Sequence, residues 1–334
     1  MTSFQCAGWV EMDGKKLTSA KTEEIVRTAP ETMRRFGGEF RISYGKCHAR
    51  DHFGIMPGPC EKGAWTCDGK KVFSIEPDPE PLALDAAISI AVNLRSDEGV
   101  VALSGGVDSS LVAALAGREC VAVGLADSHD LRQAQHAASL LGLSCTSVTI
   151  TPDEIEAAVP TVLATLPKKD PVNLGIALTQ FFIARWAGQH GYQRIITGQG
   201  ADELFGGYSR YRETTTLEED LARDVIGLEQ QADRDQSVAA LHGCYLSMPY
   251  LDIRVVRAAA AIPAKDKVHD GRRKIPLRAV AAQHIPKELA EYEKKAMQYG
   301  SGVWGVLKKT ARKNGYKTSV QDYIDHIQEA QHGH

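Results

Sequence analysis

One short run of residues in this chain has the composition of a phosphate-binding loop. Ser104-Gly105-Gly106-Val107-Asp108-Ser109-Ser110 lies between an apolar stretch, VVAL, and a helix-forming stretch, LVAALAG. Two glycines let the backbone approach an anion without an intervening side chain, and a helix start presents free N–H groups and a positive dipole end. The serine hydroxyls add donors. The pattern therefore predicts a loop that binds phosphate groups.

Asp108 is the one anionic residue in this loop. A carboxylate repels phosphate unless a cation lies between them, so we expect Mg²⁺ together with the phosphate. No lysine follows the glycines, and the loop thus differs from the G-x-x-x-x-G-K-[ST] loop of enzymes that cleave the γ-phosphate. A glycine-rich turn that binds nothing is the alternative, and the complete pattern between a strand and a helix argues against it.

A second run of glycines and carboxylates follows another apolar stretch. RIIT, at 194–197, leads into GQGADELFGGY, at 198–208. The glycines again allow close approach to a ligand. Asp202 is placed to share the magnesium ion with Asp108, so the expected metal ligands are Asp108 and Asp202.

From residue 81 onward, short apolar runs alternate with helical periodicity. The expected strands are 100–103, 120–124, 145–150 and 194–197, and the expected helices include 109–116 and 131–141. This alternation predicts an α/β fold with a parallel sheet flanked by helices, in which ligands bind at the carboxyl ends of the strands. Both glycine-rich runs follow such ends. Beyond about residue 213 the pattern predicts helices without new strands.

The first 80 residues have a different character. Glycines and alternating aromatic residues predict β-hairpins, with one helix over 22–35, and the proline-rich run at 76–85 predicts a linker. We therefore expect a small β-rich domain at 1–80 and a second domain at 81–334. A chain of 334 residues is long enough for both.

Composition limits the classes of partner. The chain is 43% hydrophobic and 24% charged, with no apolar run long enough for a membrane span and no apolar signal core, so a cytoplasmic globular protein is expected. A net charge of -3 gives no broad attraction to polyanions, and we interpret the basic segment at 308–317 as a solvated helix face. Nucleic acid is therefore not an expected partner, whereas a homo-oligomer is compatible with the sequence.

Seven cysteines without an export signal favour reduced thiols over a disulfide framework. Four of them cluster early, at Cys6, Cys47, Cys60 and Cys67. Their spacing lacks a C-x2-C pair, and we interpret them as unligated thiols, with a zinc or iron–sulfur site as the alternative.

The motifs together resemble a known family. SGGVDSS resembles the loop of PP-loop ATP pyrophosphatases, and with GQGADELFGGY it is similar to the asparagine synthetase type, which includes β-lactam-forming synthetases. The resemblance continues through MPYLD at 248–252, KIPLR at 274–278 and KKAMQY at 294–299, and covers roughly residues 85 to 305. It implies an enzyme that adenylates a carboxylate, releases pyrophosphate and forms an amide with ammonia or an amine.

The resemblance also implies roles for single residues. Lys295 matches the lysine that steadies the transition-state charge, and Lys274 matches a second lysine near the pyrophosphate. Backbone groups would meet adenine and ribose at Leu103, Val123, Thr197 and Gly198. The implied acceptor pocket consists of Gln199, Asp202 and Glu203.

The chain departs from the family in its N-terminal part. A full asparagine synthetase begins with a glutaminase domain whose catalytic cysteine follows Met1, whereas this chain has Thr2 there and its first cysteine is Cys6. ARDHFGIMP, at 49–57, is nevertheless similar to a segment near the end of that domain. We interpret residues 1–80 as a shortened, glutaminase-deficient domain. The nitrogen then comes from free ammonia, from an amine on the substrate or from a separate ammonia-supplying subunit.

Two departures concern the acceptor. Gln199 stands where asparagine-forming members carry Glu and ring-forming members carry Tyr, and a neutral amide cannot act as a base. NLGI, at 173–176, occupies a segment where aspartate-binding members place an arginine. Aspartate with ammonia is the leading substrate pair, and the acceptor stays open.

Two other hypotheses fit the sequence. One is a PP-loop enzyme that thiolates or amidates a nucleobase or cofactor, with a metal held by the cysteine cluster. The other is an ATP-binding regulator without catalytic activity. Intact Asp108, Asp202 and Lys295 favour an enzyme over the regulator.

Overall fold

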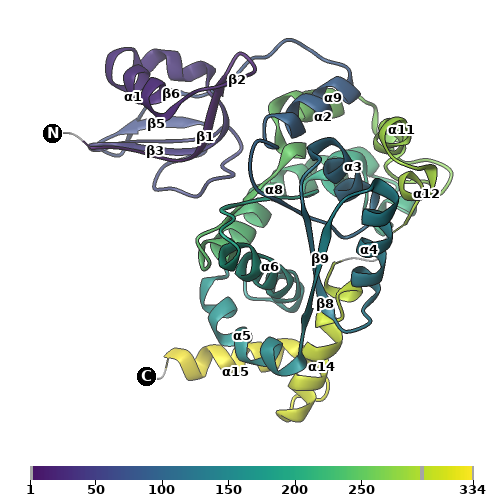
Figure 1. The fold of residues 1–334 in the computed structure, drawn as a ribbon. Coiled ribbons are helices and arrows are strands. Elements are labelled where there is room, and N and C mark those ends of the chain that lie inside the picture. The colour runs from purple at the N-terminus through teal and green to yellow at the C-terminus, as the bar shows by residue number, and fades with distance from the viewer. Residues whose placement is uncertain (1–2, 294–296, 333–334) are drawn as a thin grey trace. The chain divides into compact units, whose positions relative to one another are not determined.

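A computed structural model describes residues 3–293 and 297–332 of the chain (Figure 1). The chain forms two compact units, each assembled from separate stretches of sequence. The first unit comprises residues 1–97, 198–236 and 247–280, and the second comprises residues 98–197, 237–246 and 281–334. The division into domains near residue 80 stays a prediction.

The first unit contains a six-stranded antiparallel sheet in the order β2-β1-β3-β4-β5-β6. Its strands are β1 (Phe4–Met12), β2 (Lys15–Lys16), β3 (Gly37–Tyr44), β4 (Cys47–Arg50), β5 (Ala64–Cys67) and β6 (Lys70–Ser74). Phe36, Phe40, Trp65 and Phe73 form the centre of its apolar core. The predicted small β-rich N-terminal region is therefore present.

The helix predicted over 22–35 is two elements. Helix α1 spans Ser19–Thr28, and a separate 3-10 helix, η1, spans Pro30–Arg35. Ala29 between them has φ of -147° and ψ of 58°, outside the helical region. The cause is Pro30, because a proline ring disfavours the α conformation in the residue before it.

Cys47 and Cys67 form a disulfide, so the prediction of reduced thiols is wrong for these two residues. They are directly opposite each other on β4 and β5, a register that their separation in sequence does not reveal. Bonded sulfurs are not thiolate ligands, and the cysteine-metal hypothesis loses two of its four proposed ligands. Within residues 3–293 and 297–332, no three His, Cys, Asp or Glu side chains converge as a metal site.

Several helices follow this sheet in the first unit, and two of them, α8 and α11, continue into the segments of the second. They are α2 (Leu84–Asn93), α7 (Ala201–Phe205), η2 (Ser209–Arg212), α8 (Leu217–Ala240), η3 (Pro249–Leu251), α9 (Ile253–Ala260), α10 (Ala264–Lys267) and α11 (Ile275–His284). A smaller core of Tyr211, Leu221, Ala264 and Val268 joins α8 to α10 and η2.

The second sheet has five strands in the order β11-β10-β7-β8-β9, and the pairs β10–β7, β7–β8 and β8–β9 are parallel. Its strands are β7 (Val100–Ala102), β8 (Cys120–Leu125), β9 (Cys145–Ile150), β10 (Arg194–Ile196) and β11 (Tyr245–Ser247). Helices lie on both sides of β8 and β9 (Figure 1). The helices of the second unit include α3 (Val107–Ala116), α4 (His129–Leu141), α5 (Pro152–Thr165), α6 (Pro171–Gln189), α12 (Lys287–Ala290), α13 (Met297–Gly300), α14 (Val303–Lys313) and α15 (Val320–His332). The predicted fold class is confirmed.

Strand β11 corrects the expectation that no strand follows residue 213. It has only three residues and forms the edge of the sheet beside β10. Leu246 at its centre is fully buried. A three-residue strand is too short to show a periodicity in sequence, and its burial comes from its neighbours.

The strand order reverses direction at β7. The chain passes from β7 to β8 on one side, and β10 returns to pair with β7 on the other side. In open parallel sheets, ligands bind where the order reverses, outside the carboxyl ends of the strands. The segments that begin at Leu103 and Thr197 therefore leave the sheet from neighbouring strands.

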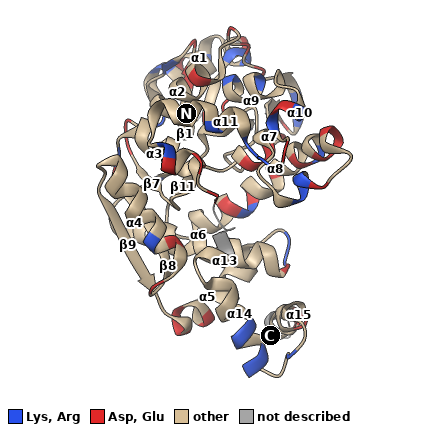
Figure 2. Cartoon of the chain, turned by 90° about the vertical axis from the view of Figure 1, so that its right-hand side faces the viewer, with Lys and Arg blue, Asp and Glu red and all other residues tan. Residues whose placement is uncertain are grey.

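The basic C-terminal segment lies mainly on α14, where Lys308, Lys309, Arg312 and Lys313 are exposed (Figure 2). This agrees with a solvated helix face. In the described part of the chain, no helix has both the length and the apolar character required to cross a bilayer.

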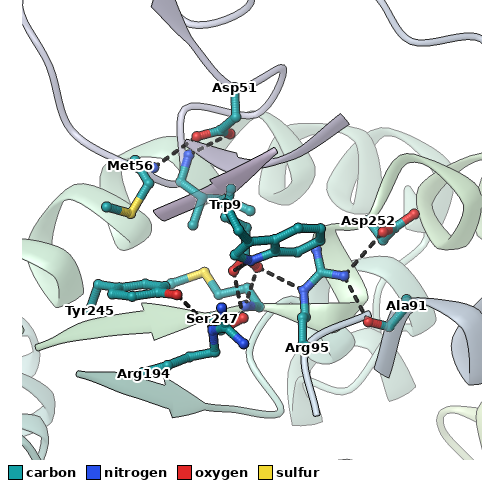
Figure 3. Close-up of polar contacts among 12 residues, drawn as sticks. Trp9, Asp51, Met56, Ala91, Arg95, Arg194, Tyr245, Ser247 and Asp252 are labelled. Atoms are coloured by element: carbon teal, nitrogen blue, oxygen red, sulfur yellow. Dashed lines mark hydrogen bonds and ion pairs between the residues drawn. The ribbon is translucent and has the colours of Figure 1, made fainter. Parts of the chain in front are cut away.

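Asp51, at the end of β4, carries a buried carboxylate. It accepts hydrogen bonds from the backbone N–H groups of Ile55 and Met56, both at 2.9 Å (Figure 3). Burial raises the pKa of Asp51 from 3.8 to about 6, although the two backbone hydrogen bonds act in the opposite direction. Ionisation of Asp51 is therefore more costly in the folded protein than in the unfolded chain.

This shift predicts a pH dependence of stability. A raised folded pKa gives a contribution that is fully present below the unfolded pKa and is lost as the pH rises through the folded pKa. We expect the wild type to lose about 2 kcal/mol of unfolding free energy relative to Asp51→Asn between pH 4 and pH 7, since one pKa unit corresponds to about 1.4 kcal/mol. Urea unfolding of both proteins measures it. A difference that stays constant over this range contradicts the assignment.

Candidate active site

The predicted phosphate loop connects β7 to α3 in the second unit. Gly105 has φ of +75°, a conformation that side-chain-bearing residues rarely adopt. A Cβ atom there would lie 2.5 Å from the carbonyl oxygen of Gln133 in α4. The loop is therefore packed closely against α4, and only glycine fits at this position.

Ser109 fixes the shape of the loop. Its hydroxyl lies 3.0 Å from the hydroxyl of Ser104, accepts the backbone N–H of Ser104 at 3.2 Å and donates to the carbonyl of Gly106 at 3.3 Å. Three contacts from one side chain hold both ends of the turn. Ser104 and Ser109 thus order the backbone that would face an anion.

The start of α3 offers donors to a ligand. Gly106 is its N-cap and supplies no side-chain capping hydrogen bond. The Ser110 hydroxyl is buried and has no hydrogen-bond partner among the described residues. An orphaned buried hydroxyl beside an uncapped helix start is what a phosphate-binding loop requires. The loop residues therefore fit ATP, and Asp108, in the first turn of α3, is buried with 2% exposure.

The residues expected around adenine and ribose lie on neighbouring strands of the second sheet. Leu103 follows β7, Val123 lies in β8 and Thr197 follows β10, and all three are buried. Strands β8 and β10 flank β7, so these positions lie near one another toward the carboxyl ends of the three strands. Gly198, the next residue, begins the second segment of the first unit.

Asp202 and Lys274 form an ion pair in the first unit, with 2.6 Å between Lys274 Nζ and Asp202 Oδ1. Asp202 lies in α7, whereas Lys274 precedes α11, is only 6% exposed and has φ of +56°. A Cβ atom on Gly207 would lie 1.7 Å from Asp202 Oδ1 and 2.2 Å from Lys274 Cε. Asp202, the predicted metal ligand, and Lys274, the predicted cation, are thus paired with each other and pack against Gly207.

The Glu203 side chain is buried and accepts two hydrogen bonds. Its Oε1 atom accepts hydrogen bonds from the Tyr208 hydroxyl and from Gln231 Nε2, the latter at 2.8 Å. Burial raises the pKa of Glu203, the charge of Asp202 raises it further, and the two hydrogen bonds lower it. Glu203 therefore orders α7 against α8.

Gln199 contacts a buried ion pair on α8. Its Nε2 group donates to Asp235, and Arg234 holds the same carboxylate through Nε at 2.7 Å and Nη2 at 2.9 Å. Arg234 and Asp235 are both almost fully buried. The side chain of Gln199 is thereby fixed with its amide nitrogen toward Asp235.

A small pocket opens beside Gln199, with a cavity volume of about 10 Å³. It is lined by Gln199, Gly200, Leu228, Gln231, Ala232, Asp235, Met248 and Leu251. The lining combines apolar side chains with two amides and one carboxylate. Such a mixture suits a small ligand that carries polar groups.

Sequence reasoning missed the α8 side of this pocket. Leu228, Gln231, Ala232 and Asp235 recur at i, i+3, i+4 and i+7, which places them on one helix face. Two polar residues within an otherwise apolar stripe are the signal that could have found them. Asp202 and Glu203 of the predicted pocket are nearby in sequence, but neither lines the cavity, whereas Gln199 does.

The positions of Lys295 and of a shared magnesium ion stay predictions. Lys295 lies outside the described residues. Asp108 and Asp202 belong to different units, so a shared magnesium ion stays a prediction. Asn173, from the segment where an arginine was sought, lies in the first turn of α6 and donates to Asp170 Oδ2 at 2.7 Å.

Comparison with known proteins places the chain in a family. Residues 83–237 and 226–327 match the sequence model of asparagine synthase. The chain belongs to the asparagine synthase family. This match contains the phosphate loop, the second glycine-rich run and both strands that lead into them.

Two curated relatives illustrate the range of this asparagine synthase family. The chain is 33% identical over 72% of its length to the "Putative asparagine synthetase [glutamine-hydrolyzing] 1" of Methanocaldococcus jannaschii, covering 53% of that protein. It is 31% identical over 68% of its length to the "Carboxyethyl-arginine beta-lactam-synthase" of Streptomyces clavuligerus, covering 46% of that protein. The chain thus spans about half the length of these relatives. An NH3-dependent NAD synthetase structure from Campylobacter jejuni covers 73% of this chain and 94% of its own, but 13% identity and a TM-score of 0.35 support no conclusion.

The Asp202–Lys274 arrangement gives a stability prediction. Gly207→Ala should lower the free energy of unfolding by about 1 to 2 kcal/mol, because the new methyl group meets the ends of the Asp202 and Lys274 side chains and displaces their ion pair. Gly227→Ala, in α8 with nothing within 4 Å of its Cβ, is the matched control and should be neutral or stabilising by about 0.5 to 1 kcal/mol. Guanidinium unfolding compares the two. Equal effects would show that Gly207 has room for a side chain.

Proposed function

We propose that this chain is an amide synthetase that consumes ATP and forms AMP and pyrophosphate. It activates a small carboxylate, with aspartate as the first candidate, and ammonia or an amine then attacks the activated carbon. The observation that carries the proposal is the loop before α3, where Ser110 is buried without a partner among the described residues and the helix start is uncapped. Membership in the asparagine synthase family supports the same chemistry.

The nucleotide half of the reaction is assigned to the loop and its surroundings. Ser104, Gly105, Gly106, Ser109 and Ser110 would bind the phosphates through backbone and hydroxyl donors. Leu103, Val123, Thr197 and Gly198 are the proposed contacts of adenine and ribose. Asp108 and Asp202 are the proposed ligands of Mg²⁺, which neutralises phosphate charge when bound.

Two lysines are assigned to the departing pyrophosphate. Lys274 is a buried cation already fixed by Asp202, so its charge is oriented before a substrate binds. Lys295 is retained as the second cation by its match to the family motif. Preorganised positive charge accelerates a step in which negative charge accumulates on a leaving group.

The acceptor half is assigned to the pocket beside Gln199. The pocket is small, with a cavity volume of about 10 Å³, and the family resemblance assigns Gln199, one of its lining residues, to the acceptor. Asp235 contributes a carboxylate to the lining, its charge is paired with Arg234, and the Gln199 amide nitrogen donates to it. The carboxylate and the two amides give the pocket hydrogen-bonding groups suited to ammonia or an amine, so we assign the nitrogen nucleophile to it.

The proposed reaction balances in two steps. A carboxylate oxygen attacks the α-phosphorus of ATP, and the bond to the β-phosphate oxygen breaks with release of pyrophosphate. The nitrogen nucleophile then attacks the acyl carbon, loses a proton, and AMP leaves as the amide forms. Asparagine synthesis in the cytoplasm, with free ammonia or ammonia from a separate subunit, is the specific form of this proposal.

A screen for AMP tests the proposed reaction. The protein is incubated with Mg²⁺, ATP and a panel of carboxylates, aspartate first, with and without ammonium chloride, and the products are measured by mass spectrometry. We expect AMP and pyrophosphate only when a carboxylate is present. Formation of ADP, or no turnover with any carboxylate, would refute the proposed function.

Substitution of Asp108 tests the role of the loop. Asp108→Asn should lower pyrophosphate release at least 100-fold without changing the circular dichroism spectrum, because the proposed metal loses a charged ligand. Lys295→Ala should have a comparable effect. Asp68→Asn is the matched control, since Asp68 is exposed and has φ of +49°, which asparagine tolerates. Wild-type turnover in the Asp108 variant would remove this residue from the mechanism.

A further inference from the structure

Glu39 is a charged residue at the centre of the N-terminal sheet. It lies in β3, opposite Trp9 of β1, and its side chain has no exposed surface. A carboxylate in that position is costly unless its oxygens are fully hydrogen-bonded. The donors that hydrogen-bond to Glu39 therefore identify the segments that the sheet fixes in position.

Four donors converge on this carboxylate. Trp9 Nε1 donates to Oε2 at 3.1 Å, and Arg95 Nε donates to Oε1 at 2.8 Å. The other two donors come from one short segment: the Ser247 hydroxyl donates to Oε2, and the backbone N–H of Met248 donates to Oε1 at 2.8 Å. In Figure 3, dashed lines from Trp9, Arg95 and Ser247 converge on this carboxylate. One residue of the sheet thus binds a segment more than 200 positions later in the chain.

That segment is a wall of the pocket. Met248 and Leu251 line the cavity beside Gln199, and they are the N-cap and the last residue of η3. At its far end, Asp252 accepts hydrogen bonds from Arg95 Nη1 at 3.1 Å and from Arg254 Nη1 at 3.0 Å. The wall is therefore fixed at both ends, and Arg95 connects the two anchors because it also contacts Glu39.

We propose that Glu39 is a positioning residue for the acceptor pocket, and that the N-terminal sheet serves as the support of the pocket wall. This inference rests on the proposed function, which assigns the pocket to the acceptor. Charge-assisted hydrogen bonds to a buried carboxylate fix the Met248 backbone. A wall that moves by about 1 Å misplaces a bound acceptor and lowers the rate of its reaction.

A matched pair of variants tests this proposal. Ser247→Ala and Trp9→Phe each remove one hydrogen bond to Glu39 Oε2, but Ser247 belongs to the pocket wall and Trp9 to the sheet. With aspartate, ammonium chloride and Mg-ATP as probes, we expect Ser247→Ala to raise the KM for aspartate about tenfold and to leave the KM for ATP unchanged. Trp9→Phe should change neither constant, and Ser247→Thr should restore the aspartate KM.

Hydrogen exchange gives a readout that does not depend on turnover. The Met248 amide should exchange at least tenfold faster in Ser247→Ala than in the wild type and at an unchanged rate in Trp9→Phe. Equal exchange rates, or equal aspartate KM values, in the two variants would overturn the role of Glu39. If no carboxylate in the panel supports AMP formation, the proposed function fails and the exchange rates alone decide whether Glu39 holds the wall.

Discussion

A buried array of five charged side chains underlies the first unit. Arg95 forms ion pairs with both Glu39 and Asp252. Arg254 forms ion pairs with Asp252 and with Glu11, the latter with 2.7 Å between Arg254 Nη2 and Glu11 Oε1. Burial alone would lower the pKa of Arg95, but the two carboxylates raise it, so the guanidinium stays charged. Removing one member leaves an unpaired charge away from water, which typically costs about 3 to 5 kcal/mol. The packing of β1, β3, the segment after α2 and the start of α9 against one another therefore depends on all five side chains.

This array links the N-terminal sheet to segments far along the chain. The sequence motifs predict a shortened glutaminase-like domain at residues 1–80. The contacts of Glu39 show a mechanical connection from β3 to the residues that line the cavity beside Gln199.

The parts predicted from sequence are those with strong local signals. Apolar runs bounded by glycine and polar residues located β7 to β10 within one or two residues, and the complete SGGVDSS motif located the start of α3. The missed parts depend on partners distant in the chain. Strand β11 is too short to have a period, and the Cys47–Cys67 pair depends on the register between β4 and β5. Glu39 and Asp235 look like ordinary polar residues until the neighbours that bury them are known.

The cavity beside Gln199 is encoded by three separate stretches: the turn after β10, one face of α8 and the turn after β11. None of these stretches includes the loop before α3. Substitutions at positions 228, 231, 232 and 235 can therefore alter the size and charge of the cavity while the phosphate-binding backbone keeps its sequence. Under the proposed function, a change of acceptor therefore needs substitutions on one helix face and leaves the residues assigned to the nucleotide as they are.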